Sequence, residues 1–177
     1  MNETPRQQAQ QYLDREKAFR LGELMTESFH PKTMTLGETS RRDLPAAVRM
    51  LQSVDRDLPP VVRRVLQSNE WQTLRSALLK AIRTGHKIFF TGCGATGRLS
   101  ILLEGAWRRF WQQSKQPRTP AVADREDIVF SVMAGGDFAL IRSVEGFEDF
   151  PGFGRRQLRD LAVSADDVVV AITEGGE

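Results

Sequence analysis

The chain has 177 residues, of which 40% are hydrophobic and 27% charged, as is typical of a globular protein with a buried core. Its formal net charge of +2 is too small to indicate a nucleic-acid partner, and no apolar run approaches the roughly 18 residues of a membrane-spanning helix. One cysteine and two histidines provide neither an internal disulfide nor a zinc site. The polar N-terminus lacks the apolar core of a signal peptide, so we expect a cytoplasmic protein without a metal or other cofactor.

The first half of the chain is predicted to be helical. Apolar residues recur at three- and four-residue spacing, and serine, aspartate, proline and glycine stand where helices begin and end. Residues 26–40 contain His30-Pro31 and Gly37 and are expected to form an extended connection. We therefore expect a helical region over residues 1–84, with helices over residues 5–26, 43–57, 61–66 and 69–84.

From residue 85 the pattern changes to alternating strands and helices. The strands are continuous apolar runs, and such alternation indicates a parallel, doubly wound sheet in three α/β/α layers. We expect this second domain to occupy residues 85–177. Three strands make a small sheet, so either the chain is a fragment of a longer protein or a second copy completes the sheet. The expected strands are residues 87–91, 127–133 and 167–173, and the expected helices are residues 96–114, 138–143 and 155–164.

The segment Gly92-Cys93-Gly94-Ala95-Thr96-Gly97-Arg98 lies between the first strand and its helix. A glycine loop that opens a helix commonly binds phosphate. The glycine spacing matches the dinucleotide fingerprint, but the acidic residue expected about 20 residues further on is missing; the first one past the second strand is Asp137. A Walker loop is excluded because Arg98 follows Gly97 in place of Lys.

Three further segments follow this loop in a recognisable order: Ala134-Gly135-Gly136, Glu145-Gly146-Phe147-Glu148-Asp149 and the strand over residues 167–172. Together the four segments resemble the sugar isomerase (SIS) domain. The nearest branch is the one that holds N-acetylmuramic acid 6-phosphate etherase and the glucokinase regulatory protein, and the helical residues 44–66 also resemble its N-terminal region. The resemblance covers about residues 40–177.

The resemblance implies a site for a hexose or amino-sugar 6-phosphate at the carboxyl ends of the strands. It also implies a homodimer and, on the regulatory side of the branch, a partner sugar kinase. A second phosphate loop would follow the third strand, where Glu174 and Glu177 would repel a phosphate unless they point away. The implied binding residues are Gly92, Gly94, Ala95, Thr96, Gly97, Arg98, Gly135, Gly136, Glu145, Thr173 and Gly175.

The etherases of this branch use two glutamates as acid and base. The resemblance places one at Glu148 and the other at residue 106, which is alanine here. Glu104 lies two residues away and therefore on a different face of a helix. We accordingly expect a sugar-phosphate-binding protein resembling the glucokinase regulatory protein. The alternative is an etherase-like lyase or sugar-phosphate isomerase that uses Glu148 as acid or base.

Several residues with reactive or aromatic side chains have simpler interpretations. Cys93 is expected to be a small buried residue of the loop, because no base is placed near it in the sequence. His86, just before the first strand, is expected to be structural. Trp107, Phe110 and Trp111 are expected to lie in the core or at an interface.

Overall fold

The computed structural model describes residues 4–15, 28–113, 125–144 and 146–174. Contacts divide the chain into two compact units, Met1–Val65 and Leu66–Glu177, and each is described by itself. The predicted domain boundary between residues 84 and 85 stays a prediction. None of the helices in the described ranges is long and apolar enough to cross a membrane.

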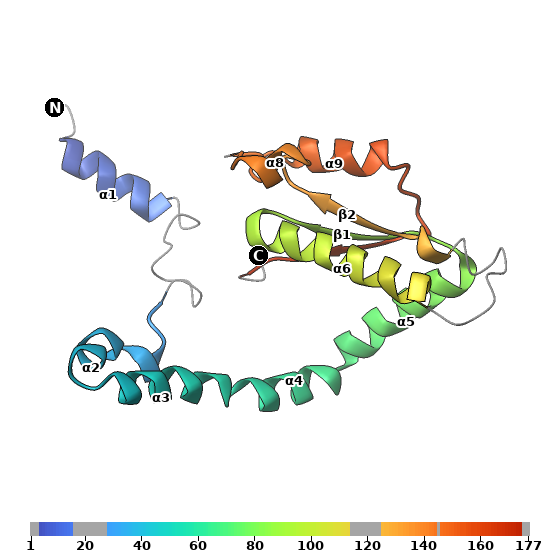
Figure 1. Ribbon diagram of the computed structural model, residues 1–177. Helices are drawn as coiled ribbons and strands as arrows, with labels where there is room; N and C mark the ends of the chain where they lie inside the picture. The colour runs from blue at the N-terminus through green and yellow to red at the C-terminus, as the bar shows by residue number, and fades with distance from the viewer. Residues whose placement is uncertain (1–3, 16–27, 114–124, 145, 175–177) are drawn as a thin grey trace. The chain divides into compact units, whose positions relative to one another are not determined.

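The described elements of the first unit are all helices (Figure 1). Asp43 caps one of them, α3, because its carboxylate accepts a hydrogen bond from the Ala46 N–H at 2.9 Å. The expected helix over residues 5–26 is described only as far as Arg15. The elements are α1 (Pro5–Arg15), η4 (Pro31–Thr33), α2 (Leu36–Arg42), α3 (Leu44–Asp55) and α4 (Leu58–Leu66).

The expected extended connection over residues 26–40 is wrong where the structure describes it. Its second half forms η4 and α2, and α2 packs against α3. Glu38 and Arg42, one helical turn apart, form an ion pair at 3.0 Å. Gly37 does not prevent this helix, because the packing of α2 against α3 outweighs the roughly 1 kcal/mol that one glycine costs.

The second unit alternates helices and strands. α5 begins where the Ser68 hydroxyl accepts the Trp71 N–H at 3.1 Å, and it ends at Gly85, whose φ of +75° is readily adopted only by glycine. Two helices begin earlier than expected: Gly94 opens α6, and Pro151, in the first turn where its fixed φ is favourable, opens α9. The elements are α5 (Asn69–Thr84), β1 (Ile88–Gly92), α6 (Gly94–Gln113), β2 (Val129–Met133), α8 (Phe138–Ile141), α9 (Pro151–Asp160) and β3 (Val168–Ala171).

The three strands form one parallel sheet in the order β2-β1-β3, which confirms the predicted parallel architecture. Ile88 pairs with both Val129 and Val168, so β1 lies in the centre. Because all strands run the same way, the loops that follow them lie at a common carboxyl edge. This edge brings together segments that are about 40 residues apart in the sequence.

The sheet separates two layers of helices (Figure 1). On one face, Ile88 and Val129 pack with Ala81 of α5, and Trp107 of α6 joins this core. On the other face, Phe89 is fully buried and its ring stacks on Phe130 at 5.3 Å between centroids. α6 and α9 lie on opposite sides of the sheet, which gives the expected three layers.

At the amino-terminal edge of the sheet, Lys87 and Asp167 join β1, β3 and the end of α9. The Lys87 ammonium donates to the carbonyls of Leu161 and Ala162, at 2.8 and 3.2 Å. Asp167 accepts the Lys87 N–H and the Ser164 N–H, each at 2.7 Å.

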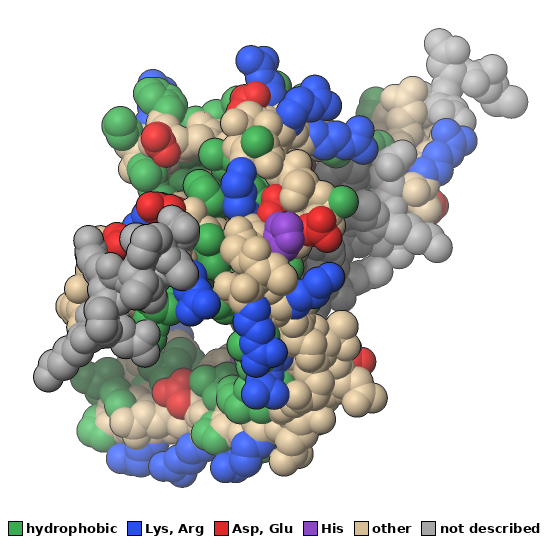
Figure 2. All heavy atoms as spheres, turned by 90° about the vertical axis from the view of Figure 1, so that its right-hand side faces the viewer, with side chains coloured by type: hydrophobic (Ala, Val, Ile, Leu, Met, Phe, Trp, Pro, Cys, Tyr) green, Lys and Arg blue, Asp and Glu red, His purple; other side chains and the backbone are tan. Residues whose placement is uncertain are grey.

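The side of the molecule in Figure 2 carries basic, acidic and hydrophobic side chains interspersed with one another.

Candidate functional site

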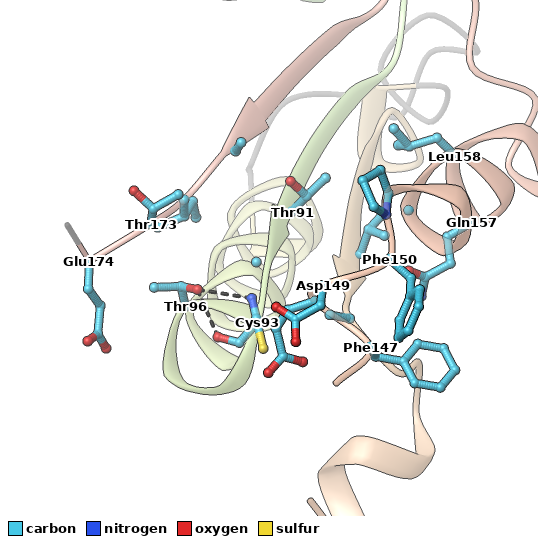
Figure 3. A pocket seen from close by; sticks show the side chains of 18 residues that line it. Thr91, Cys93, Thr96, Phe147, Asp149, Phe150, Gln157, Leu158, Thr173 and Glu174 are labelled. Atoms are coloured by element: carbon cyan, nitrogen blue, oxygen red, sulfur yellow. Dashed lines mark hydrogen bonds between the residues drawn. The ribbon is translucent and has the colours of Figure 1, made fainter. Parts of the chain in front are cut away.

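A pocket of about 660 Å³ opens at the carboxyl edge of the sheet (Figure 3). Its residues come from four parts of the chain: the end of β1 with the start of α6, the end of β2, α9 with the segment that leads into it, and the end of β3. The described lining residues are Thr91, Gly92, Cys93, Thr96, Val132, Ala134, Phe147, Glu148, Asp149, Phe150, Pro151, Gly154, Gln157, Leu158, Ala171, Ile172, Thr173 and Glu174.

The glycines of the loop between β1 and α6 are required by its geometry. A Cβ on Gly92 would lie 2.6 Å from the carbonyl carbon of Thr96, and a Cβ on Gly97 would lie 2.9 Å from the Gly92 oxygen. Gly94 has a φ of +50°, in the left-handed region. The loop therefore needs glycine at these positions to let the first turn of α6 pack against the end of β1, whether or not a ligand is bound.

The Thr96 hydroxyl closes this loop. It accepts the Cys93 N–H at 3.1 Å and donates to the Cys93 carbonyl at 2.8 Å, as Figure 3 shows. The Gly97 N–H donates to the same carbonyl at 3.1 Å. These bonds hold the start of α6 at the pocket, where the positive end of the helix dipole favours an anion.

Cys93 is exposed and lines the pocket, so the expectation of a buried cysteine is wrong. The reason is the turn itself: the tight approach of Gly92 and Gly97 leaves the residue after Gly92 on the outside. The thiol therefore stands beside Thr96 at the wall of the cavity (Figure 3).

A second part of the pocket wall combines carboxylates with aromatic rings. Glu148 and Asp149 line the pocket just before α9 begins. The rings of Phe147 and Phe153 stack at 4.4 Å between centroids, and Phe150 meets Phe153 edge to face at 5.7 Å. This wall can offer hydrogen-bond acceptors and an apolar surface to the same ligand.

The described lining residues include three carboxylates and no lysine or arginine. The carboxylates belong to Glu148, Asp149 and Glu174. Arg98 is exposed and is not among the lining residues. The feature of this lining that favours an anion is therefore the start of α6, with its helix dipole.

The structure brings together only some of the residues expected in the site. Gly92, Thr96, Glu148 and Thr173 line the pocket, whereas Glu145 and Gly175 lie outside the described residues. Phe147, Phe150 and Gln157 line the pocket and were not expected from the sequence. Pro151 was the available signal, because proline is common in the first turn of a helix, and a helix that starts there brings these residues to the pocket. The expected binding residues absent from the described lining are Gly94, Ala95, Gly97, Arg98, Gly135 and Gly136.

Ala106 and Glu104 lie on different faces of α6, as expected. Ala106 is exposed, whereas Glu104 faces β2 and accepts the Ser131 N–H at 2.7 Å and the Ser131 hydroxyl at 2.6 Å. Arg108 donates to the same carboxylate at 3.0 Å. Partial burial raises the pKa of Glu104, but the hydrogen bonds from Ser131 and Arg108 outweigh it and leave the pKa below its usual value. Glu104 therefore remains ionised and bound to β2.

No group of three or more His, Cys, Asp and Glu side chains is placed to hold a metal ion in the parts of the chain that are described. The parallel sheet, the glycine loop at its carboxyl edge and the adjoining pocket define the class: an α/β protein whose candidate site is built from strand-to-helix loops.

Residues 72–177 match the family described as the glucokinase regulatory protein N-terminal SIS domain. The chain therefore belongs to this family, and the SIS-type fold expected from its motifs is confirmed.

Similar proteins include N-acetylmuramic acid 6-phosphate etherases. The one from Pectobacterium atrosepticum is 32% identical over 157 residues, covering 88% of this chain and 46% of the relative. Those from Mesorhizobium japonicum and Yersinia pestis are 32% and 33% identical, covering 86% and 88% of this chain and 45% and 48% of the relatives. The chain thus spans about half the length of the curated relatives it matches.

Proposed function

We propose that the pocket binds a sugar phosphate, a hexose or amino-sugar 6-phosphate. The observation that carries the proposal is the position of the pocket in an SIS-family chain: it joins the start of α6, at the glycine loop, to the acidic and aromatic wall before α9. The first part suits a phosphate and the second suits a sugar ring.

In the proposed arrangement the phosphate lies at the start of α6. There the helix dipole favours the negative charge of the phosphate. In this arrangement the sugar lies between the phosphate and the carboxylates of the wall and of Glu174, which reduces the repulsion between them. The hydroxyl groups of the sugar donate to Glu148 and Asp149. An apolar face of the ring packs on Phe147 or Phe150.

Binding without turnover is the favoured role. Alanine at residue 106 cannot move a proton, and Glu104 is held by Ser131 and Arg108. A sugar-phosphate-binding protein resembling the glucokinase regulatory protein fits these residues. In that role we propose a homodimer whose ligand state affects a partner sugar kinase.

The binding proposal is tested with the full chain by alkylation of Cys93, the single cysteine, which lines the pocket. Glucose, fructose, glucosamine and N-acetylmuramic acid 6-phosphates are added in turn, with the unphosphorylated sugars and inorganic phosphate as controls. A bound sugar phosphate at ten times its Kd should slow alkylation about tenfold and raise the Tm. If no sugar phosphate slows alkylation or raises the Tm, the proposal is wrong.

A second candidate is an etherase-like lyase or a sugar-phosphate isomerase. It is favoured by the 32–33% identity to the etherases and by Glu148 in the pocket. Turnover of N-acetylmuramic acid 6-phosphate and isomerisation of hexose 6-phosphates are the assays. If Glu148 is the acid or base, Glu148→Gln should lower turnover about 10²- to 10⁴-fold. Turnover that is unchanged in this variant would exclude the role.

A further inference from the structure

The last residues of β2 contact the glycine loop. The Ala134 N–H donates to the Gly92 carbonyl at 2.9 Å, and Met133 pairs in register with Gly92. A Cβ on Gly97 would lie 2.8 Å from the Met133 Cγ, so the methionine side chain packs against the first turn of α6. The position of Met133 is thus tied to that of the loop.

The Met133 carbonyl is also the point at which α9 is joined to this end of the sheet. It accepts the Gly136 N–H at 2.9 Å and the Gln157 side-chain amide at 2.8 Å. Among the described residues, β2 has β1 as its one neighbouring strand, so this carbonyl lies at the open edge of β2. Gln157 supplies a second donor, and the carbonyl would keep the Gly136 N–H without it.

α9 and the residues after it are joined to the sheet at two places. Just after α9, Leu161 and Ala162 accept hydrogen bonds from the Lys87 ammonium. Within α9, the bond from Gln157 to Met133 is the described hydrogen bond that joins the helix to a strand. Glu148 and Phe150, which directly precede α9, are exposed, and Phe150 contacts Phe153 of α9, so the position of this segment is connected to that of the helix.

We propose that Gln157 is a positioning residue for the pocket. By binding the Met133 carbonyl it holds the wall that carries Glu148 and Asp149 at a set separation from the glycine loop. Figure 3 shows Gln157 beside Phe150, across the pocket from Thr96. The expected effect of Gln157 on ligand binding rests on the proposed sugar-phosphate function. Its effect on the position of the wall can be tested without a ligand.

The test uses the full chain and the rate of Cys93 alkylation by iodoacetamide. Rates are measured at alkaline pH, where the thiol is fully ionised, so that changes in its pKa do not contribute. Gln157→Met keeps the length of the side chain and removes its donor. Gln112→Met is the matched control, because it removes a similar amide bond, from Gln112 to Glu126, on the far part of α6.

Without ligand, the Cys93 alkylation rate of Gln157→Met should differ from that of the wild type by at least about threefold, because Cys93 lines the same pocket and its surroundings change when the wall moves. Gln112→Met should react at the wild-type rate. Gln157→Lys, which keeps an N–H donor of sufficient reach, should restore a rate near that of the wild type. Urea unfolding of each variant shows whether a changed rate reflects a general loss of stability. If Gln157→Met does not fold, Gln157→Lys, which retains a donor, is compared with Gln157→Glu, which lacks one.

Equal alkylation rates in wild type and Gln157→Met, or in Gln157→Lys and Gln157→Glu, would overturn the proposal. With glucose 6-phosphate or N-acetylmuramic acid 6-phosphate as the probe, Gln157→Met should also show weaker protection of Cys93 than Gln112→Met does. If neither probe protects the wild type, the proposed function fails for these sugars, whereas the role of Gln157 is still decided by the rates measured without ligand.

Discussion

At the scale of single residues, several side chains that look like ligand-binding groups are already used by the fold. The Thr96 hydroxyl bonds to both backbone groups of Cys93, and Glu104 bonds to Ser131. A polar residue beside a candidate site therefore has a structural role whenever the geometry gives it partners. The groups of the pocket wall that remain for a ligand are chiefly Glu148 and Asp149.

Asp167 gives a prediction about stability and pH. Its side chain is 4% exposed. Burial raises its pKa, but hydrogen bonds from the Lys87 and Ser164 N–H groups and the nearby Lys87 charge lower it further, so the folded pKa lies below the usual value. The carboxylate therefore contributes stability at pH above about 4, and this contribution is lost as the pH falls through the folded pKa.

Asp167→Asn should lower the free energy of unfolding by about 1–3 kcal/mol at pH 7, because one amide oxygen cannot replace two carboxylate oxygens facing two N–H donors. The difference from the wild type should shrink as the pH is lowered below about 4. Urea unfolding at pH 7 and pH 3 measures it. The exposed neighbour Asp166 provides the control Asp166→Asn, which should have little effect; equal effects at the two positions would contradict the prediction.

Glu174 gives a prediction about ligand charge. It is exposed, lines the pocket and carries a negative charge that opposes a phosphate. Glu174→Gln should strengthen binding of a sugar phosphate about two- to threefold at low salt, and the gain should disappear near 1 M salt because exposed charges are screened. Calorimetric titration measures it, with Glu70→Gln on α5 as a control. Weaker binding in Glu174→Gln would show that this carboxylate contacts the ligand directly.

At the scale of an element, two of the three glycines in α6, Gly97 and Gly105, have opposite requirements. A Cβ on Gly97 would lie 2.8 Å from the Met133 Cγ and 2.9 Å from the Gly92 oxygen, whereas one on Gly105 would meet nothing within 4 Å. The first glycine lets the helix approach the sheet. The second only weakens the helix.

Gly97→Ala should therefore destabilise the protein by about 1–3 kcal/mol through overpacking, and Gly105→Ala should stabilise it by about 0.5–1 kcal/mol through helix propensity. Thermal unfolding of the two variants, which add the same methyl group to the same helix, measures the contrast. Two changes of the same sign would contradict the packing argument.

At the scale of the whole molecule, burial is concentrated in the second unit. Phe89, Ile88 and Val129 are at most 2% exposed, whereas Ala47 is the one buried hydrophobic residue among the described residues of Met1–Val65. In α4, Leu58, Val61, Val62 and Val65 are all more than 40% exposed. The helices of the first unit therefore gain little from burial within that unit.

Hydrogen exchange of the full chain should reflect this difference. Amide hydrogens of β1 and β2 should exchange most slowly, and those of α3 and α4 should exchange much faster, because local stability depends on buried apolar contacts. Mass spectrometry of peptides from the two units measures the rates. Slow exchange in α4 would mean that a surface outside this unit covers its apolar face.

Most of the second unit could be predicted from the sequence, because its signals are local. The apolar runs at β1, β2 and β3 are continuous, which favours parallel strands, and glycine and serine mark the ends of α5. Short elements are harder to predict: α2 depends on packing against α3, and α9 begins at Pro151, before the expected start at residue 155. The site was predicted in part, since Gly92, Thr96, Glu148 and Thr173 do line one pocket.

The parallel α/β class and the glycine loop between β1 and α6 can be predicted from the sequence, because the hydrophobic period and the glycine spacing are local patterns of a few residues. The group that each polar side chain faces depends on tertiary packing. This packing placed Cys93 at the pocket wall, bound Glu104 to β2 and set Gln157 against Met133, more than 20 residues away in the chain. Such pairings depend on how strands and helices pack, which the local pattern of residues does not specify.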